Sequence, residues 1–356
     1  MEIAKSASGG TKALIVSPYL DHLGGGERYM LSVAEVLESL GHQVVFAWDN
    51  LEEVSKLARM LGITLTSPTL DAKIKSLYFA NNPLSMYQAT KAYDIVVYLS
   101  DGSIPLLGGK HNILHMQVPF HGVGGRSWKN QFKKRFIDHV IVNSKFTKDI
   151  IDAEYGIKSV IVYPPVHPVE CTAPKEKIIL SVGRFEPSLN TKKQDVLLGA
   201  WRALSPRLPG WKLVLAGASS SDDWLKHLQG LARDLPVEFK VNATYDELCQ
   251  LYAVSQIYWH AAGYGIDELK NPELTEHFGI STVEAVSAGC IPLVVPRGGQ
   301  SEIITNPDLH WTSKEELIDK TLGLINHPNK SHYLSEINIS SYTVQAFAAS
   351  LSKLLI

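Results

Sequence analysis

The chain of 356 residues has few cysteines, no long apolar run and almost no net charge. Its three cysteines, Cys171, Cys249 and Cys290, form no Cys-x-x-Cys pair, which argues against a zinc site or a disulfide framework and suits a reducing cytoplasm. No stretch approaches the roughly 18 consecutive apolar residues of a membrane-spanning helix, and residues 1–12 lack the apolar run of a signal peptide. A formal net charge of −2 gives no reason to expect nucleic acid as a partner. We therefore expect a cytoplasmic, globular protein.

Short apolar runs alternate with helix-length segments along the chain, which is the pattern of parallel α/β sheets. The first run, 13–17, leads through the glycines at 24–26 into a helical pattern at about 27–40. The pattern restarts at 178–182 and leads into a second helical pattern at about 192–204. This restart predicts two doubly wound α/β domains, in keeping with the chain length. Further runs that we expect to be strands are 43–48, 94–99, 139–143, 212–216, 257–260 and 291–295.

A proline-rich segment marks the boundary between these domains. Residues 163–168 read Tyr-Pro-Pro-Val-His-Pro, which suits neither a helix nor a central strand. We expect an N-terminal domain at 1–165, a linker at 166–177 and a C-terminal domain at 178–338. In the remaining segment, 339–356, apolar residues from Val344 to Leu354 recur at helical spacing and predict a C-terminal helix.

Two carboxylates, Glu276 and Glu284, stand eight residues apart, and an apolar run at helical spacing follows the second. The segment from Ser281 to Glu284 matches a capping box, which predicts a helix that begins at Ser281 with Glu284 in its first turn. Gly279 permits close approach of a ligand, and the free amides of a helix start attract anions. These features suit a diphosphate with one carboxylate near each end. In the alternative, Glu284 only caps the helix and Glu276 is a solvated loop residue.

Several motifs resemble those of one enzyme family. The run from Glu276 to Pro292 resembles the Glu-x7-Glu signature of retaining nucleotide-sugar glycosyltransferases with two facing Rossmann-like domains, the GT-B architecture of the group 1, family 4 type. The Gly-Gly-Gln-Ser-Glu run at 298–302 also matches that family. Weaker likenesses are the segments 181–185 with the lysines at 192 and 193, 142–147, 163–166, and the Gly-Gly-Gly-Glu-Arg run at 24–28. The resemblance covers both halves of the chain and is strongest in the second.

The resemblance implies a GT-B fold with an acceptor-binding N-terminal domain, a donor-binding C-terminal domain and a C-terminal helix that returns to the first domain. It implies transfer of a hexose, with mannose or glucose favoured, from a UDP- or GDP-sugar to a hydroxyl of a glycan or lipid-linked acceptor, with retention at the anomeric carbon. The sequence contains no Asp-x-Asp motif, and Asp222 and Asp223 are adjacent to each other. We therefore expect no metal and no other cofactor.

The resemblance also assigns roles to individual residues. Glu276 and His115 are expected in catalysis, and Glu276, His277, Phe278 and Glu284 are expected to hold the donor's sugar and ribose. The expected phosphate ligands are Arg184, Lys193, Gly279, Ile280, Ser281, Gly25 and Gly26, with Lys192 as the alternative to Lys193. From the residues alone, 191–194 predict a second capped helix start, where two lysines are unfavourable unless an anion docks beside them.

An aromatic stripe at Trp128, Phe132 and Phe136 recurs at helical spacing among five basic residues. We expect it to pack on the sheet, with the basic side chains in water. The alternative is a basic interfacial helix on anionic lipid, which would place the protein peripherally at the inner face of a membrane.

Two alternative functions fit the same architecture. One is an epimerase that acts on a nucleotide sugar without an acceptor, and the other is a non-catalytic carbohydrate-binding protein. An NAD site is disfavoured, because the glycines at 24–26 do not complete a Gly-x-Gly-x-x-Gly motif.

Overall fold

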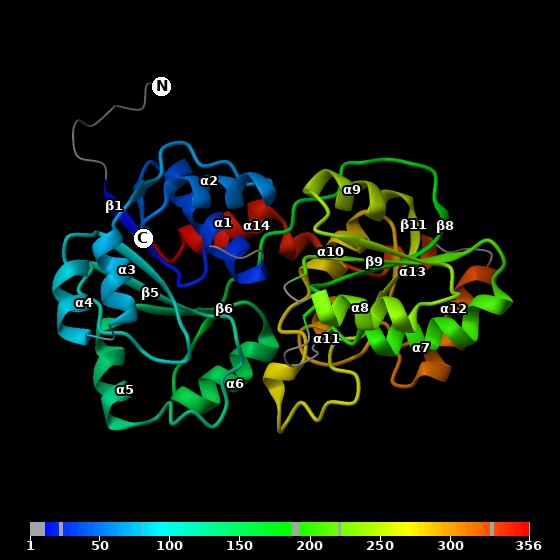
Figure 1. Cartoon of the computed structure of the whole chain (residues 1–356). Coiled ribbons are helices and arrows are strands. Elements are labelled where there is room, and N and C mark those ends of the chain that lie inside the picture. The colour runs from blue at the N-terminus through cyan, green and yellow to red at the C-terminus, as the bar shows by residue number, and fades with distance from the viewer. Residues whose placement is uncertain are drawn as a thin grey trace.

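The computed structural model describes residues 11–20, 24–80, 82–186, 192–219, 222–327 and 331–355, which form two α/β domains side by side (Figure 1). The first sheet is wholly parallel, in the order β3-β2-β1-β4-β5-β6-β7. Its strands are β1 (Lys12–Val16), β2 (Gln43–Phe46), β3 (Thr69–Leu70), β4 (Ile95–Leu99), β5 (His111–Met116), β6 (His139–Val142) and β7 (Val160–Ile161). Its helices are α1 (Gly25–Ser39), α2 (Leu51–Met60), α3 (Ala72–Phe79), α4 (Pro83–Thr90), α5 (Trp128–Lys133) and α6 (Lys145–Tyr155).

The second sheet is also parallel, in the order β10-β9-β8-β11-β12. Its strands are β8 (Glu176–Val182), β9 (Lys212–Gly217), β10 (Val237–Val241), β11 (Ser255–His260) and β12 (Ile291–Val294). The helices of this half are α7 (Gln194–Leu204), α8 (Asp222–Leu231), α9 (Tyr245–Val254), α10 (Ile280–Ser287), α11 (Gln300–Ile303), α12 (Lys314–Asn326) and α13 (Ser331–Ser335), and α14 (Val344–Ser352) ends the chain. The prediction of two doubly wound α/β domains is confirmed.

The central strands are largely apolar because helices cover both faces of a parallel sheet. Strand β4 is buried along its whole length, whereas the edge strand β10 is only half-buried. The charged residues Glu238 and Lys240 interrupt β10, which explains why no apolar run marked it in the sequence. The second sheet begins at Glu176, within the segment that we expected to be linker.

The chain passes between the domains twice, and the two passages are adjacent. The backbone N–H of Val166 donates to the carbonyl of Tyr342 at 2.8 Å, and Val166 forms a parallel bridge with Thr343. Beyond this point, Phe347 and Leu351 of α14 are buried in the core of the N-terminal domain. The ring of Phe347 meets that of Tyr29 edge-on at 5.2 Å, so α14 lies beside α1 (Figure 1).

The aromatic stripe is largely exposed, which makes its expected packing on the sheet wrong for two of its three residues. Trp128 is 76% exposed and Phe132 is 51% exposed. Only Phe136 is partly covered, and its ring contacts those of Tyr87 and Phe132. Helical spacing alone could not show that α5 has so little of the sheet beneath it. Within the described ranges, no helix is both long and apolar enough to cross a bilayer.

Candidate active site

A cleft of about 920 Å³ lies between the two domains and is lined by both. The N-terminal domain contributes the start of α1 and the residues after β5, and the C-terminal domain contributes the ends of β8 and β9 and the loop into α10. Ligands bind at the carboxyl ends of parallel strands because helix starts and loops gather there. The predicted site residues that line the cleft are Gly25, Gly26, Arg184, Glu276, His277, Phe278, Gly279, Ile280, Ser281 and Glu284.

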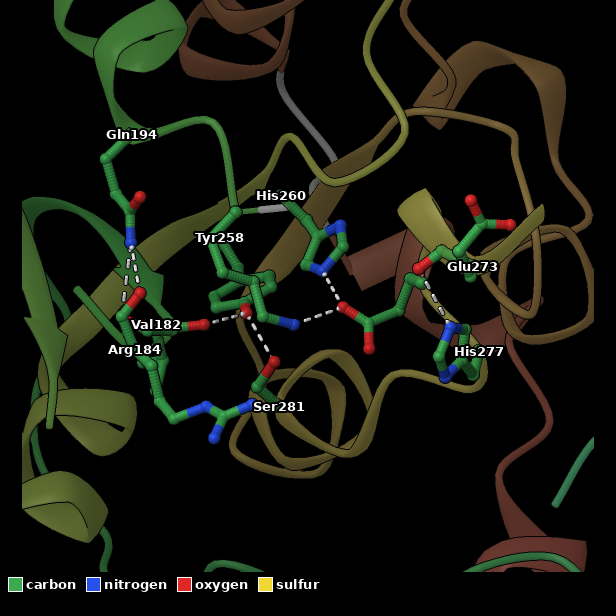
Figure 2. A network of polar contacts seen from close by, with 11 residues as sticks. Val182, Arg184, Gln194, Tyr258, His260, Glu273, His277 and Ser281 are labelled. Carbon is green, nitrogen blue, oxygen red and sulfur yellow. Dashed lines mark hydrogen bonds and ion pairs between the residues drawn. The ribbon is translucent and has the colours of Figure 1, made fainter. Parts of the chain in front are cut away.

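Glu276 is the centre of a polar network at the sugar end of the predicted site. Its Oε2 accepts from Nζ of Lys192 at 2.6 Å and from Nε2 of His260 at 2.8 Å. Figure 2 shows His260 aimed into this network from the end of its strand. Although burial opposes ionisation, Lys192 and His260 hold the pKa of Glu276 well below its usual range. Burial also lowers the pKa of His260, so we expect a neutral imidazole beside an ionised carboxylate.

The loop that carries Glu276 rests on two glycines of the Gly-Gly-Gln-Ser-Glu motif. The backbone N–H of Gly299 donates to the carbonyl of Glu276 at 2.7 Å. A Cβ at Gly298, where φ is +61°, would lie 2.1 Å from the same carbonyl. A side chain at this position would therefore displace the backbone of Glu276, which explains why glycine follows the strand here.

The starts of α1 and α10 meet across the cleft. Gly24 and Gly279 are their N-cap residues, and neither supplies a side-chain hydrogen bond to the helix amides. A Cβ added to Gly25 would lie 3.6 Å from Cδ1 of Ile280, so the two helix starts lie close together. Each end carries partial positive charge, which makes their junction favourable for an anion. Arg184 lies beside it, with Nη1 3.8 Å from the Cβ position of Gly24.

The predicted capping box at Ser281 is wrong. Helix α10 begins at Ile280, directly after Gly279, whose φ of 123° is costly for other residues. The hydroxyl of Ser281 accepts from that of Tyr258 at 2.8 Å instead of capping the helix (Figure 2). Glu284 consequently lies beyond the first turn, and its carboxylate is free for a tertiary contact.

Glu284 joins the two domains. Its Oε1 accepts from Nη1 of Arg28 at 2.5 Å, and its Oε2 accepts from the hydroxyl of Tyr252 at 3.0 Å. Arg28 lies in α1 of the first domain and is only 7% exposed. Its Nε and Nη2 are buried and have no acceptor among the described residues. An unmade hydrogen bond of this kind costs about 1–3 kcal/mol or more for a charged group.

His115 does not reach the cleft, contrary to the expectation. It lies on β5, is fully buried, and stacks on the ring of Tyr29 with centroids 3.9 Å apart. Burial lowers its pKa to about 3, so the imidazole is neutral. His115 is the fifth of the six residues of β5 and pairs with Leu99 and Ile141 on the neighbouring strands, which places it inside the sheet.

Lys192 and Lys193 lie before α7 and not in its first turn. Helix α7 begins at Gln194, and Lys193 occupies the preceding position in a left-handed conformation with φ 51°. The predicted cap, Thr191, falls outside the described residues. Lys192 lines the cleft and contacts Glu276, whereas Lys193 is not among the lining residues. The geometry therefore favours Lys192 over Lys193 as a cleft cation.

A second carboxylate from the C-terminal domain reaches the first domain. The oxygens of Glu302 accept from the backbone N–H groups of Lys145 and Phe146 at 2.9 and 2.7 Å. These amides are at the start of α6, where an anion is favoured by the helix dipole. Glu302 thus helps to fix the two domains around the cleft, a role that its motif did not reveal.

Sequence reasoning underestimated four residues of the site: Arg28, Lys192, Tyr252 and His260. The position of His260 at the end of a predicted strand could have indicated a site residue. Lys192 is adjacent to Lys193, which was the expected phosphate ligand. Tyr252 lies inside α9 and carries no local signal. Among the described residues, no group of three or more His, Cys, Asp or Glu side chains is placed to hold a metal ion.

Comparisons with known proteins match both halves of the chain to family models. Residues 23–170 match the model described as "Glycosyltransferase Family 4", and residues 165–340 match "Glycosyl transferases group 1". A human GDP-Man:Man(3)GlcNAc(2)-PP-Dol alpha-1,2-mannosyltransferase is 34% identical over 48% of this chain and 36% of its own length. The matched part is thus only about a third of that relative. The alpha-1,3/1,6-mannosyltransferase alg-2 of Neurospora crassa is 23% identical over 81% of this chain and 76% of its own.

Solved structures agree on the fold. A glycosyltransferase from Rickettsia africae has a TM-score of 0.71 and 17% identity, covering 98% of both chains. The pneumococcal O-GlcNAc transferase GtfA, in complex with UDP and GlcNAc, has a TM-score of 0.69 and 11% identity over 97% of this chain and 98% of its own.

Proposed function

Since this chain belongs to the glycosyl transferases group 1 family and has the GT-B fold, we propose that it transfers mannose from GDP-mannose to a hydroxyl of a lipid-linked glycan, with retention. The donor and acceptor are those that the names of its mannosyltransferase relatives give. The observation that carries the proposal is the ionised Glu276 beside an anion-binding junction of two helix starts. Glucose remains the competing sugar, and UDP remains the competing nucleotide.

The proposed reaction is limited by departure of the diphosphate as positive charge develops at the sugar. Arg184, Lys192 and the helix starts at Gly25 and Ile280 would stabilise the charge that grows on the phosphate. Lys192 and the two helix starts are held in place before reaction and need little reorganisation. We infer that this set of protein cations serves in place of a metal. Treatment with a chelator is therefore expected to leave turnover unchanged.

Glu276 is suited to binding sugar hydroxyls and not to donating a proton. A carboxylate with a strongly lowered pKa stays ionised at neutral pH and accepts hydrogen bonds. Lys192 and His260 orient it and leave Oε1 for a sugar hydroxyl. Glu284, one turn further along α10, would accept a hydrogen bond from a ribose hydroxyl.

The exposed surface of α5 supports a peripheral membrane contact. Trp128 and Phe132 are exposed together with Lys129 and Arg135. Residues 119–127 connect Val118, which lines the cleft, to α5. An aromatic and basic surface suits the interface of an anionic bilayer.

The test of the proposed function is turnover of purified protein with GDP-mannose, UDP-glucose and a lipid-linked glycan acceptor. Glu276→Ala is expected to lower turnover by at least about 10²-fold, while Glu315→Ala, an exposed carboxylate on α12, serves as the control. If Glu276→Ala kept wild-type turnover, the assignment would be wrong. Conversion of the donor to an epimerised nucleotide sugar without acceptor would instead identify an epimerase. Donor binding without any release of nucleoside diphosphate would identify a non-catalytic protein.

A further inference from the structure

Arg28 is a cleft residue whose hydrogen-bonding capacity is only partly used. One of its nitrogens, Nη1, donates to Glu284 across the domain boundary at 2.5 Å. The other two, Nε and Nη2, form a single edge of the guanidinium and have no acceptor within the described part of the chain. The side chain is 91% buried, so this edge gains little from water.

The surroundings of this edge favour an anion. Arg28 belongs to the first turn of α1, next to Gly25 and Gly26 at the junction with α10. Arg184 and the starts of α1 and α10 line the same cleft and favour a phosphate there, although Glu27 also lies in the first turn of α1. The Nε–Nη2 edge of arginine matches two oxygens of a phosphate group, which lysine cannot reproduce.

We propose that Arg28 binds the donor phosphate nearest the ribose with this edge while its Nη1 holds Glu284. The inference rests on the proposed function, because it assumes a nucleoside diphosphate in the cleft. Arg28 lines the cleft, so a small movement of its side chain that keeps the Nη1–Glu284 bond would present this edge to the incoming phosphate. The donor is then bound by both domains, and the N-terminal domain contributes a charged side chain beside the glycines at 25 and 26 that the family resemblance already assigns to the phosphates.

Calorimetry on the full chain with nucleoside, nucleoside monophosphate and nucleoside diphosphate, for both guanosine and uridine, tests this proposal. Arg28→Met keeps the length and packing of the side chain but removes the edge. Its affinity for the monophosphate and diphosphate is expected to fall about tenfold or more, with a much smaller change for the nucleoside. Arg28→Lys is expected to lose affinity to an intermediate extent, because it keeps the charge without the fork. Arg126→Met, at an exposed arginine that bonds the carbonyl of Ala153, is the control.

An equal loss for nucleoside and diphosphate would overturn the proposal, since Arg28 would then act only by positioning Glu284. Unchanged affinity for the diphosphate would overturn it as well. If Arg28→Met fails to fold, as judged by its melting temperature, the comparison of Arg28→Lys with wild type decides in the same way. Absence of binding of any of these compounds by the wild-type chain would instead contradict the proposed function.

Discussion

Nζ of Lys192 lies 2.6 Å from Oε2 of Glu276, so the residue before the left-handed Lys193 supplies the cation beside this carboxylate. The left-handed turn at Lys193 separates the two lysines just before α7 begins. This ion pair connects the segment before α7 with the carboxylate that the proposed reaction uses. It also distinguishes two neighbouring lysines that the sequence could not separate.

Replacing each lysine separately tests this distinction. Lys192→Met is expected to lower turnover by about tenfold or more. The substitution removes a positive charge that stabilises the negative charge growing on the phosphate, and it also removes the ion pair that orients Glu276. Lys193→Met is the matched control, and its turnover is expected to stay within about twofold of wild type, which corresponds to less than about 0.5 kcal/mol. Steady-state kinetics with saturating acceptor provide the comparison. A larger loss for Lys193→Met would restore the original choice.

Gly298 is expected to be essential for the shape of the Glu276 loop. In Gly298→Ala the new Cβ must avoid the Glu276 carbonyl at 2.1 Å and adopt a φ of +61°. We expect a loss of about 1–3 kcal/mol in the free energy of unfolding, with a fall in turnover. Gly323→Ala, inside α12 with nothing within 4 Å of its Cβ, should instead be neutral or stabilising by up to about 1 kcal/mol. Urea unfolding would measure both, and equal stabilities for the two variants would refute the argument.

The buried His115 is expected to make the fold sensitive to acid. Its pKa of about 3 is below the value of 6.5 in an unfolded chain. Between these values the unfolded state binds a proton that the folded state does not, so stability falls as the pH drops below 6.5. His115→Phe keeps an aromatic ring on Tyr29 and removes this proton. The loss of unfolding free energy between pH 7 and pH 5 should then be smaller by about 2 kcal/mol, and an unchanged loss would argue against a buried neutral imidazole.

The exposed aromatic surface of α5 is expected to bind anionic membranes. Trp128→Ser with Phe132→Ser should lose co-sedimentation with vesicles of phosphatidylglycerol and phosphatidylcholine, because the apolar contact area is removed. Lys129→Glu should weaken binding and make it less dependent on salt. Leu269→Ser, at a residue 84% exposed on the other domain, is the matched control. Binding to the vesicles that survives the double substitution would show that another surface is responsible.

Local patterns predicted most of the fold and part of the site. Strands such as β4 and β9 were visible because parallel strands buried on both faces are continuous apolar runs. Glu276 and Gly279 were recognisable because a loop and a glycine before a helix form a local motif. Edge strand β10 was not recognisable, because charged residues alternate along it. The start of α10 was predicted at the wrong residue, because the Ser-x-x-Glu pattern at Ser281 resembles a capping box.

What the sequence determined by itself was two parallel α/β domains and the segment that carries Glu276 and Glu284. These depend on interactions between residues near one another along the chain. The partners of the two carboxylates were decided only by the tertiary structure. Lys192 and His260 meet Glu276 across 84 and 16 residues, and Arg28 meets Glu284 across 256. Such contacts depend on how two domains close around a cleft, and no local spacing encodes that packing.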